Sequence, residues 1–244
     1  VYLPMENKKL VAELKGNFPE PEAPGASGSE KKDQPAGRKC PVAAVDLVTL
    51  RKQYLDVQGW LTIPDTGIDY PVLQSEQENG EFYLKRNYKK EYDINGSLFL
   101  QADCKVSESR NLIIYGHNIN GRRYFGYLQN FREETFFKEY PVFSFTPVEK
   151  KEQDYHIVSV LESDKYADYY SFTDYGNEKD YYGMVEKILS HSKFQSEAAK
   201  KMKREMDESS AEAFFRKYKF VTLSTCRTMD GKDKRLMVIG CRKR

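Results

Sequence analysis

The chain has 244 residues, and its 39 lysines and arginines nearly balance its 37 aspartates and glutamates, which leaves a formal net charge of +2. A nucleic-acid-binding domain needs a clustered excess of cations to neutralise phosphates, and the sequence has no basic arm of that kind. The mean hydropathy of −0.74 is low, yet 18 tyrosines, 14 phenylalanines and 1 tryptophan supply ring surface for a core. We therefore expect one folded domain with a polar extension and no nucleic-acid partner.

The longest apolar runs, such as residues 112–115 and 236–241, fall far short of the roughly 20 residues that a bilayer-spanning helix requires. The chain begins at Val1, with neither a charged n-region nor an apolar h-region. We expect that any signal or anchor has been removed, so that the native protein reaches a membrane only through an N-terminal segment missing from this chain.

Prolines and glycines recur through residues 18–41 among serine, glutamate and lysine, with almost nothing apolar to bury. Such a composition is typical of a linker or stalk. Residues 5–14 could form a helix, but one shorter than the roughly 12 to 15 residues at which isolated helices become marginal in water. We predict a flexible extension over residues 1–41 and a folded domain over residues 42–244.

The folded domain begins with apolar residues at helical spacing. Leu47, Leu50, Tyr54 and Val57 share one face, and Gly59 follows as a terminator, which predicts a helix leading into the fold. Short β-type runs follow it. They cover residues 60–64, 68–73, 97–100, 111–115, 142–146, 155–161, 219–225 and 235–241.

Eight short strands predict a mainly β fold, a closed or nearly closed barrel with an N-terminal helix. Between the sixth and seventh strands, residues 179–218 have helical composition, which predicts a long helical insertion. Met184 and Ile188 belong to one apolar stripe there, and Met202 and Met206 to a second. Helices need this spacing for burial, so we interpret the stripes as packing faces rather than as a cofactor site.

Three histidines are candidates for a general base. His191 ends a helical run, where a basic side chain suits the helix dipole, and His156 lies in an alternating strand and is expected to face solvent. His117 follows the apolar strand of residues 111–115 across Gly116. A residue at the end of a strand is held by a rigid sheet and exposed to substrate, which favours His117.

Four cysteines, Cys40, Cys104, Cys226 and Cys241, are too few for a disulfide scaffold and have no zinc-type spacing, and we predict neither metal nor cofactor. Cys226 ends the seventh strand, as His117 ends the fourth. A thiol nucleophile and its acid/base partner must converge in this way, although a buried inert cysteine and a loop histidine remain the alternative.

Arg235 opens the eighth strand. If the last two strands form a hairpin, it lies near Cys226 and could stabilise a thiolate or an oxyanion.

These residues carry a resemblance to a known family. Residues 222–226 (Thr-Leu-Ser-Thr-Cys) match the TLxTC signature of sortases, and residues 115–118 (Tyr-Gly-His-Asn) match their histidine motif. The sequence resembles the class B branch in particular, over about residues 47–240. The further matching segments are residues 59–64, 68–72, 96–100 and 125–128, together with the helical insertion.

The resemblance implies a cysteine transpeptidase that cleaves a C-terminal sorting signal after its threonine. Cys226 is then the nucleophile that forms a thioester, His117 the acid and later the base, and Arg235 the group that stabilises the oxyanion. It also implies that Tyr115, Ser224 and Thr225 line the peptide groove, for which ordinary strand packing is the alternative.

The partners implied by the resemblance are sorting-signal peptides of secreted surface proteins and, as acceptor, an amine of a cell-wall precursor or of a pilin. The implied location is the outer face of a Gram-positive-type cell membrane, and we expect a monomer. A class B-like pilin polymerase, a cysteine peptidase that uses water, and a non-catalytic surface protein on the same barrel are the alternatives.

Two points of chemistry stay open at this stage. The residue after the cysteine is often acidic in relatives, whereas here it is Arg227, a second cation that could contact substrate in place of Arg235. Free cysteine and histidine side chains have reference pKa values of about 8.5 and about 6.5, so most of such a pair is neutral at pH 7. We hypothesise that catalysis uses the minority thiolate and imidazolium form.

Overall fold

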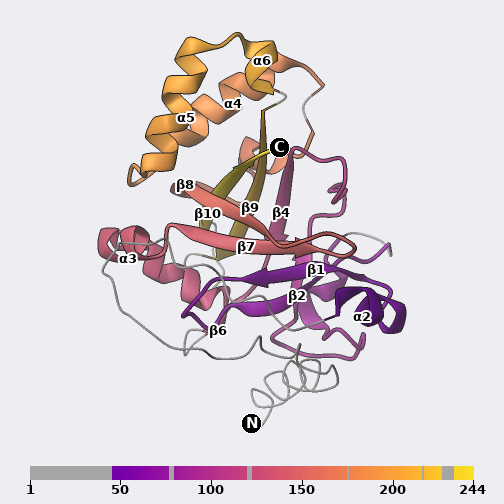
Figure 1. Ribbon diagram of the computed structural model, residues 1–244. Helices are drawn as coiled ribbons and strands as arrows, with labels where there is room; N and C mark the ends of the chain where they lie inside the picture. Colours follow the sequence, from indigo (N-terminus) through magenta and orange to yellow (C-terminus); the bar gives the residue numbers. More distant parts are fainter. Residues whose placement is uncertain (1–45, 77–79, 120–122, 175, 216, 227–233) are drawn as a thin grey trace, which may run out of the picture.

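A computed structural model describes residues 46–244 except residues 77–79, 120–122, 175, 216 and 227–233. Eight strands close into a barrel in the order β1-β2-β3-β4-β9-β10-β8-β7 (Figure 1), so the predicted eight-stranded barrel is confirmed. The extension predicted over residues 1–41 lies outside the described residues. The barrel strands are β1 (Val57–Thr62), β2 (Asp69–Leu73), β3 (Leu98–Leu100), β4 (Asn111–Tyr115), β7 (Val142–Pro147), β8 (Gln153–Asp164), β9 (Tyr218–Cys226) and β10 (Lys234–Lys243).

The barrel is mixed, because β2 pairs with β3 and β4 pairs with β9 in parallel while the other pairs are antiparallel. Its last two strands are buried on both faces. In β10, Leu236 and Val238 face the barrel core, whereas Met237 and Ile239 pack in a second core with the helices. This alternation between two apolar environments explains why residues 236–241 read as an uninterrupted apolar run.

Three helices separate β8 from β9: α4 (Glu178–Ser190), α5 (Glu197–Glu208) and α6 (Ala211–Phe215). Figure 1 shows them together at one end of the molecule, beyond β8 and β10. Met184 and Ile188 of α4 and Met202 and Met206 of α5 are all buried in the second core. The two apolar stripes are therefore packing faces.

The remaining elements are short. They are α2 (Leu47–Gln53), α3 (Glu134–Glu139), the 3₁₀ helices η1 (Phe82–Lys85), η2 (Phe125–Arg132) and η3 (Asp168–Ser171), and a small ribbon of β5 (Asn118–Ile119) and β6 (Arg123–Tyr124). The elements η1 and η3 turn out to flank the candidate site, and neither shows the apolar periodicity from which a longer helix is predicted.

The predicted first helix was too long. Asp46 caps α2 by accepting from the backbone N–H groups of Val48 and Thr49, but the helix ends at Gln53, and Val57 already belongs to β1. Gly59 lies within β1 and does not terminate a helix. A Cβ on Gly59 would stand 2.6 Å from the carbonyl oxygen of Thr146 on β7, so glycine is needed there for close approach of two strands.

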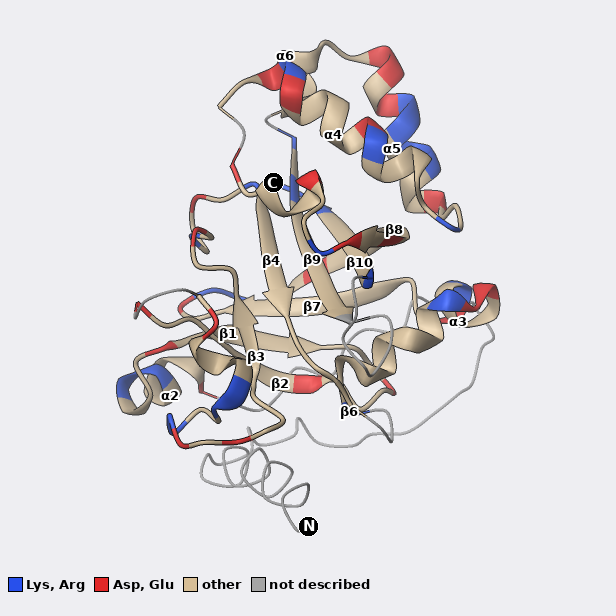
Figure 2. Ribbon diagram, turned by 180° about the vertical axis from the view of Figure 1, so that it is seen from behind, with Lys and Arg blue, Asp and Glu red and all other residues tan. Residues whose placement is uncertain are grey.

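Charged residues are frequent on the helices and connecting segments, and in the barrel they lie mainly near the ends of β8 and β10. Figure 2 shows lysine, arginine and acidic residues mixed along α5, while β4 and most of β7 and β9 carry neither sign. Across the described part of the chain, no helix combines the length and apolarity needed to cross a bilayer. The near-zero net charge is thus the sum of many solvated charges of both signs.

Candidate active site

The parallel pair of β4 and β9 brings two strand ends to the same rim of the barrel. Tyr115 stands opposite Ser224 in the register, and the N–H of Gly116 donates to the carbonyl oxygen of Ser224 at 3.2 Å. His117 and Cys226 each lie two residues beyond that Tyr115 and Ser224 pair. Because parallel strands end at the same edge, their backbones continue side by side at this rim.

The antiparallel pair of β9 and β10 adds the third predicted residue. Arg235 stands opposite Cys226 in the register, as the hairpin prediction requires. Arg235 is partly exposed and lines the same groove as His117. Arg227, the competing cation, lies outside the described residues.

An open groove of about 540 Å³ runs along this rim. Its walls come from η1, from the ends of β3 and β4, from η3 with the segment before it, and from the ends of β9 and β10. Such a concave surface with a few polar groups is the usual form of a peptide or small-molecule site. The lining residues that matter below are Leu84, Gln101, Tyr115, His117, Tyr170, Ser224, Thr225 and Arg235.

Backbone and side-chain hydrogen bonds hold the histidine segment at the rim. The Nε2 atom of His117 lies 2.7 Å from the carbonyl oxygen of Leu84 in η1. The hydroxyl of Thr225 donates to the carbonyl oxygen of Gly116 at 2.8 Å, and the N–H of Phe125 donates to the carbonyl oxygen of His117 at 3.1 Å. Thr225 is 2% exposed, so its hydroxyl ties the ends of β4 and β9 together beneath the groove surface.

One wall of the groove is aromatic. The rings of Tyr115 and Tyr170 stack with their centroids 5.9 Å apart, and the Tyr170 hydroxyl lies 2.8 Å from the Ser224 hydroxyl. The Tyr115 hydroxyl donates to the Gln101 side chain, whose Nε2 atom donates to the carbonyl oxygen of Tyr170 at 2.9 Å. The side chain of Gln101 therefore fixes the two rings relative to each other.

The titration of Tyr115 follows from its position in this wall. Burial raises the pKa of Tyr115 well above its ordinary value, and the nearby positive charge of Arg235 opposes this only in part. The phenol is therefore neutral at physiological pH and acts as a hydrogen-bond donor. Arg235 lines the same groove as Tyr115.

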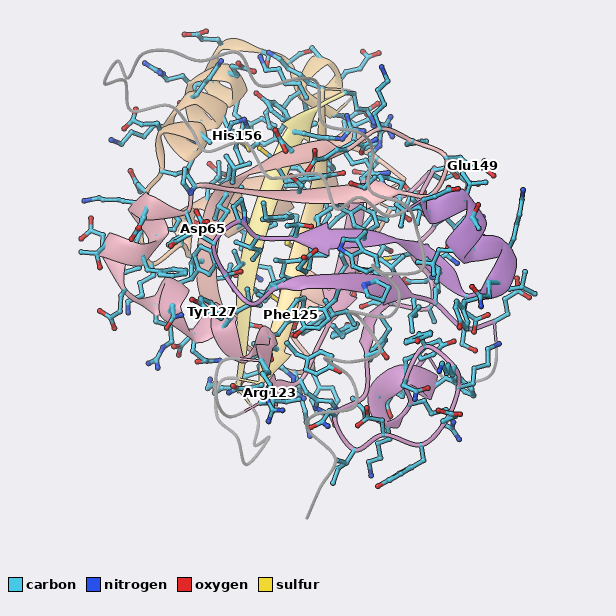
Figure 3. The ribbon with its side chains drawn as sticks, turned by 60° about the horizontal axis from the view of Figure 1, so that its bottom comes forward. Asp65, Arg123, Phe125, Tyr127, Glu149 and His156 are labelled. Carbon is cyan, nitrogen blue, oxygen red and sulfur yellow. The ribbon has the colours of Figure 1, made fainter. Side chains whose placement is uncertain are left out.

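The other two histidines lie away from this rim. His156 is exposed on β8. Figure 3 shows it on the side of the molecule nearest the helices and far from Phe125, whose backbone N–H is hydrogen-bonded to the His117 carbonyl. His191 is the C-cap residue of α4, and its Nδ1 atom lies 2.6 Å from the Tyr169 hydroxyl. Both positions agree with the structural interpretation of these histidines.

Sequence reasoning missed the contributions of Leu84, Gln101 and Tyr170. Leu84 acts through its backbone carbonyl, which leaves no side-chain signal, and Tyr170 lies in a 3₁₀ turn without periodicity. Gln101 directly follows the strand of residues 98–100, so the strand-end argument used for His117 could have found it. In the described part of the chain, no group of three or more potential metal ligands is found.

Comparison with known proteins gives the family. A family model described as a sortase domain matches residues 61–243. The chain is 31% identical over 196 residues to sortase B of Listeria monocytogenes, covering 80% of this chain and 72% of the relative. A crystal structure of sortase B from B. anthracis aligns with a TM-score of 0.73 and 26% identity, over 100% of this chain and 99% of that one. The Staphylococcus aureus sortase B and substrate complex, 22% identical, has the same fold with a TM-score of 0.67 over 80% and 83% of the two chains.

These matches define a cysteine transpeptidase that is cell-surface or membrane-associated, and the chain belongs to the sortase family. Within that family its relatives and structural neighbours are class B sortases, the branch that the motifs around residues 59–72 and 96–100 resemble. The fold class predicted from the sequence is that of these proteins.

Proposed function

We propose that this protein cleaves a C-terminal sorting signal after its threonine and transfers the new acyl end to an amine. The register of β4, β9 and β10 carries this proposal, because it sets Cys226 opposite Arg235 and beside the strand end that leads to His117. An open groove of about 540 Å³ passes over the same rim and offers room for part of a peptide. The substrate complex of S. aureus sortase B adds support by family analogy.

In the first half of the reaction, the Cys226 thiolate attacks the threonine carbonyl carbon. The oxygen becomes negatively charged, and Arg235 stabilises it, because a guanidinium stays charged and offers several fixed donors. When the tetrahedral intermediate collapses, the C–N bond breaks and the His117 imidazolium gives its proton to the leaving amine. The products of this half are a thioester on Cys226, a released peptide and a neutral His117.

In the second half, an incoming amine attacks the thioester carbonyl carbon. Neutral His117 takes a proton from the attacking nitrogen, the C–S bond breaks, and Cys226 leaves as a thiolate. The thiolate and imidazolium are thereby restored together, and a new amide bond has formed. The proton that His117 gives in the first half is thus replaced in the second, and no external acid or base is needed.

The groove wall supplies the peptide contacts in this proposal. Tyr115, Ser224 and Thr225 all line the groove, and the Thr225 hydroxyl also supports the backbone of the histidine segment. The partners are sorting-signal peptides of secreted surface proteins and, as acceptor, an amine of a cell-wall precursor or of a pilin. We place the enzyme at the outer face of the cell membrane, where these partners meet.

The deciding experiment uses a peptide library of sorting signals, incubated with the protein with and without triglycine as the amine acceptor. We expect a coupled product whose yield depends on triglycine, a thioester detected by mass spectrometry at Cys226, and no product from Cys226→Ala or His117→Asn. His156→Gln is the matched control, since His156 is exposed and distant, and it should retain full activity.

Each other outcome contradicts part of the proposal. Cleavage that proceeds equally without an amine identifies a cysteine peptidase with water as acceptor. Turnover that survives in Cys226→Ala removes the thioester mechanism altogether.

A further inference from the structure

The side chain of His117 contacts a backbone carbonyl rather than a carboxylate. Its Nε2 atom is 2.7 Å from the carbonyl oxygen of Leu84. A carbonyl oxygen only accepts hydrogen bonds, so a contact of this length requires a proton on Nε2. The proton is present on Nε2 in the neutral ring and in the imidazolium alike. The nitrogen that gains and loses a proton is then Nδ1.

The carbonyl of Leu84 is held in place by its neighbours in η1. The carbonyl oxygen of Tyr83 accepts from the N–H of Ser97 at 3.0 Å, and that of Lys85 accepts from the N–H of Asp93 at 3.0 Å. The segment of residues 93–97 is therefore hydrogen-bonded to η1 on both sides of Leu84. The carbonyl between these two bonded groups is the one that meets the histidine.

Gly96 lies within this segment of residues 93–97 and has two unusual properties. Its φ angle is +60°, a left-handed conformation that residues with a Cβ rarely adopt. A Cβ at this position would stand 2.4 Å from the carbonyl oxygen of Leu84 and 2.6 Å from that of Tyr83. Any side chain at Gly96 would thus displace the very carbonyl that holds the ring of His117.

We propose that Gly96 is a positioning residue for the catalytic histidine: the absence of a side chain there keeps the Leu84 carbonyl on Nε2 of His117, and proton transfer passes through Nδ1. This inference rests on the acid and base role of His117 in the proposed function. Gly96 thus contributes to the site around His117, although it lies more than twenty residues before His117 in the chain.

In the reaction, both proton transfers then take place at one nitrogen of the His117 ring, Nδ1. The Nδ1–H of the imidazolium gives its proton to the leaving amine, and the lone pair of Nδ1 later takes one from the entering amine. Nε2 keeps its hydrogen throughout and stays bonded to Leu84. The ring therefore does not rotate between the two half-reactions.

The first test reads the ring directly, by ¹⁵N NMR of the wild-type protein labelled in histidine, with His117→Asn used to assign the signal. We expect the neutral ring of His117 to carry its proton on Nε2. A neutral ring protonated on Nδ1, or an even mixture of the two forms, overturns the proposal. The measurement does not depend on turnover, so it separates this inference from the proposed function, which fails on its own if His117→Asn remains active.

The second test compares two glycines with the same backbone conformation. Gly80 has a φ angle of +65°, close to that of Gly96, but the nearest atom to its added Cβ would be the Cβ of Ala102, at 3.1 Å. Asparagine tolerates the left-handed region better than other residues with a Cβ, so Gly96→Asn and Gly80→Asn impose similar backbone strain. The two variants differ in the clash with the carbonyl of Leu84.

We expect Gly96→Asn to lower kcat by about 10- to 100-fold with little change in KM, since a displacement of about 1 Å in a catalytic group has effects of this size. Its His117 signal should lose the pure Nε2–H form, whereas Gly80→Asn should keep it. A folded Gly96→Asn with the wild-type signal and kcat overturns the role of Gly96. If Gly96→Asn does not fold, Gly96→Ala, which adds only a Cβ beside the Leu84 carbonyl, is judged by the same two criteria.

Discussion

The hydroxyl groups of Tyr170 and Ser224 lie 2.8 Å apart and join two parts of the chain that the sequence separates by 54 positions. Tyr170 belongs to η3, which follows β8, and Ser224 lies near the end of β9, two residues before Cys226. This contact fixes the η3 wall to the strand that carries the nucleophile. Together with the Gln101 hydrogen bond to the Tyr170 carbonyl, it holds this wall of the groove in place.

The first prediction concerns this contact. Tyr170→Phe removes one hydroxyl and Ser224→Ala the other, and the loss of one neutral hydrogen bond corresponds to about 0.5–1.5 kcal/mol. We expect each variant to raise KM for the peptide by about 2- to 12-fold and the double variant to add little more, because both remove the same interaction. Steady-state kinetics over the double-mutant cycle checks this. Fully additive effects would show that the two hydroxyls act separately on the substrate.

The second prediction concerns Arg235. Arg235→Ala should lower kcat/KM by about 100- to 1,000-fold, the usual cost of removing an oxyanion donor, and Arg235→Lys should recover little, because lysine lacks the planar fork. Lys234→Ala is the matched control. It removes the neighbouring cation, which is paired with Asp164 at 2.9 Å and exposed. Near-normal turnover in Arg235→Ala would transfer the oxyanion role to Arg227.

The third prediction concerns thiol reactivity. Burial raises the pKa of Cys104 and that of Cys241 to about 12 each, so both stay as neutral thiols at pH 7 to 9. Both are also free and buried. In a Cys40→Ser background we expect iodoacetamide to label Cys226 alone in the native protein and all three remaining thiols after denaturation. Peptide mapping by mass spectrometry checks this, and native labelling of Cys104 or Cys241 would contradict it.

The sequence was most informative where a residue ends a strand. The apolar runs at residues 111–115 and 219–225 located β4 and β9 to within a residue or two, and His117, Cys226 and Arg235 were singled out because each stands at such an end. The strand alternation also assigned His156 to solvent. These inferences depend only on local patterns, which the sequence shows directly.

The parts that sequence reasoning missed depend on contacts between distant segments. The local sequence around Gly59 is typical of a helix terminator, whereas its actual role depends on the close approach of β7. Likewise, no local pattern marks the Leu84 carbonyl as the partner of His117. Gln101 and Tyr170 meet through a side chain and a carbonyl from segments far apart in the chain. Pairing partners of this kind are set by the tertiary fold rather than by periodicity.

The last prediction concerns Glu205, which fastens α5 to the ends of β9 and β10. Its carboxylate accepts from Lys217 and Tyr218 at 2.5 Å and from Lys243 at 2.9 Å. Burial opposes its ionisation, but these three hydrogen bonds outweigh burial and lower the pKa of Glu205 to about 2, against an ordinary value of 4.5. The folded state therefore favours the ionised carboxylate more than the unfolded state does.

A carboxyl whose pKa is lowered by folding adds stability above its unfolded pKa and loses it as the pH falls through the folded value. Glu205→Gln should thus lower the free energy of unfolding by about 1–3 kcal/mol at pH 7, with a difference that shrinks between pH 4.5 and pH 2. Urea unfolding across that range measures it. Glu197→Gln is the control, because the side chain of Glu197 is 85% exposed in its pair with Lys200, and an exposed ion pair of this kind adds little to stability. Equal effects of the two substitutions at pH 7 would show that Glu205 does not fasten the helices to the barrel.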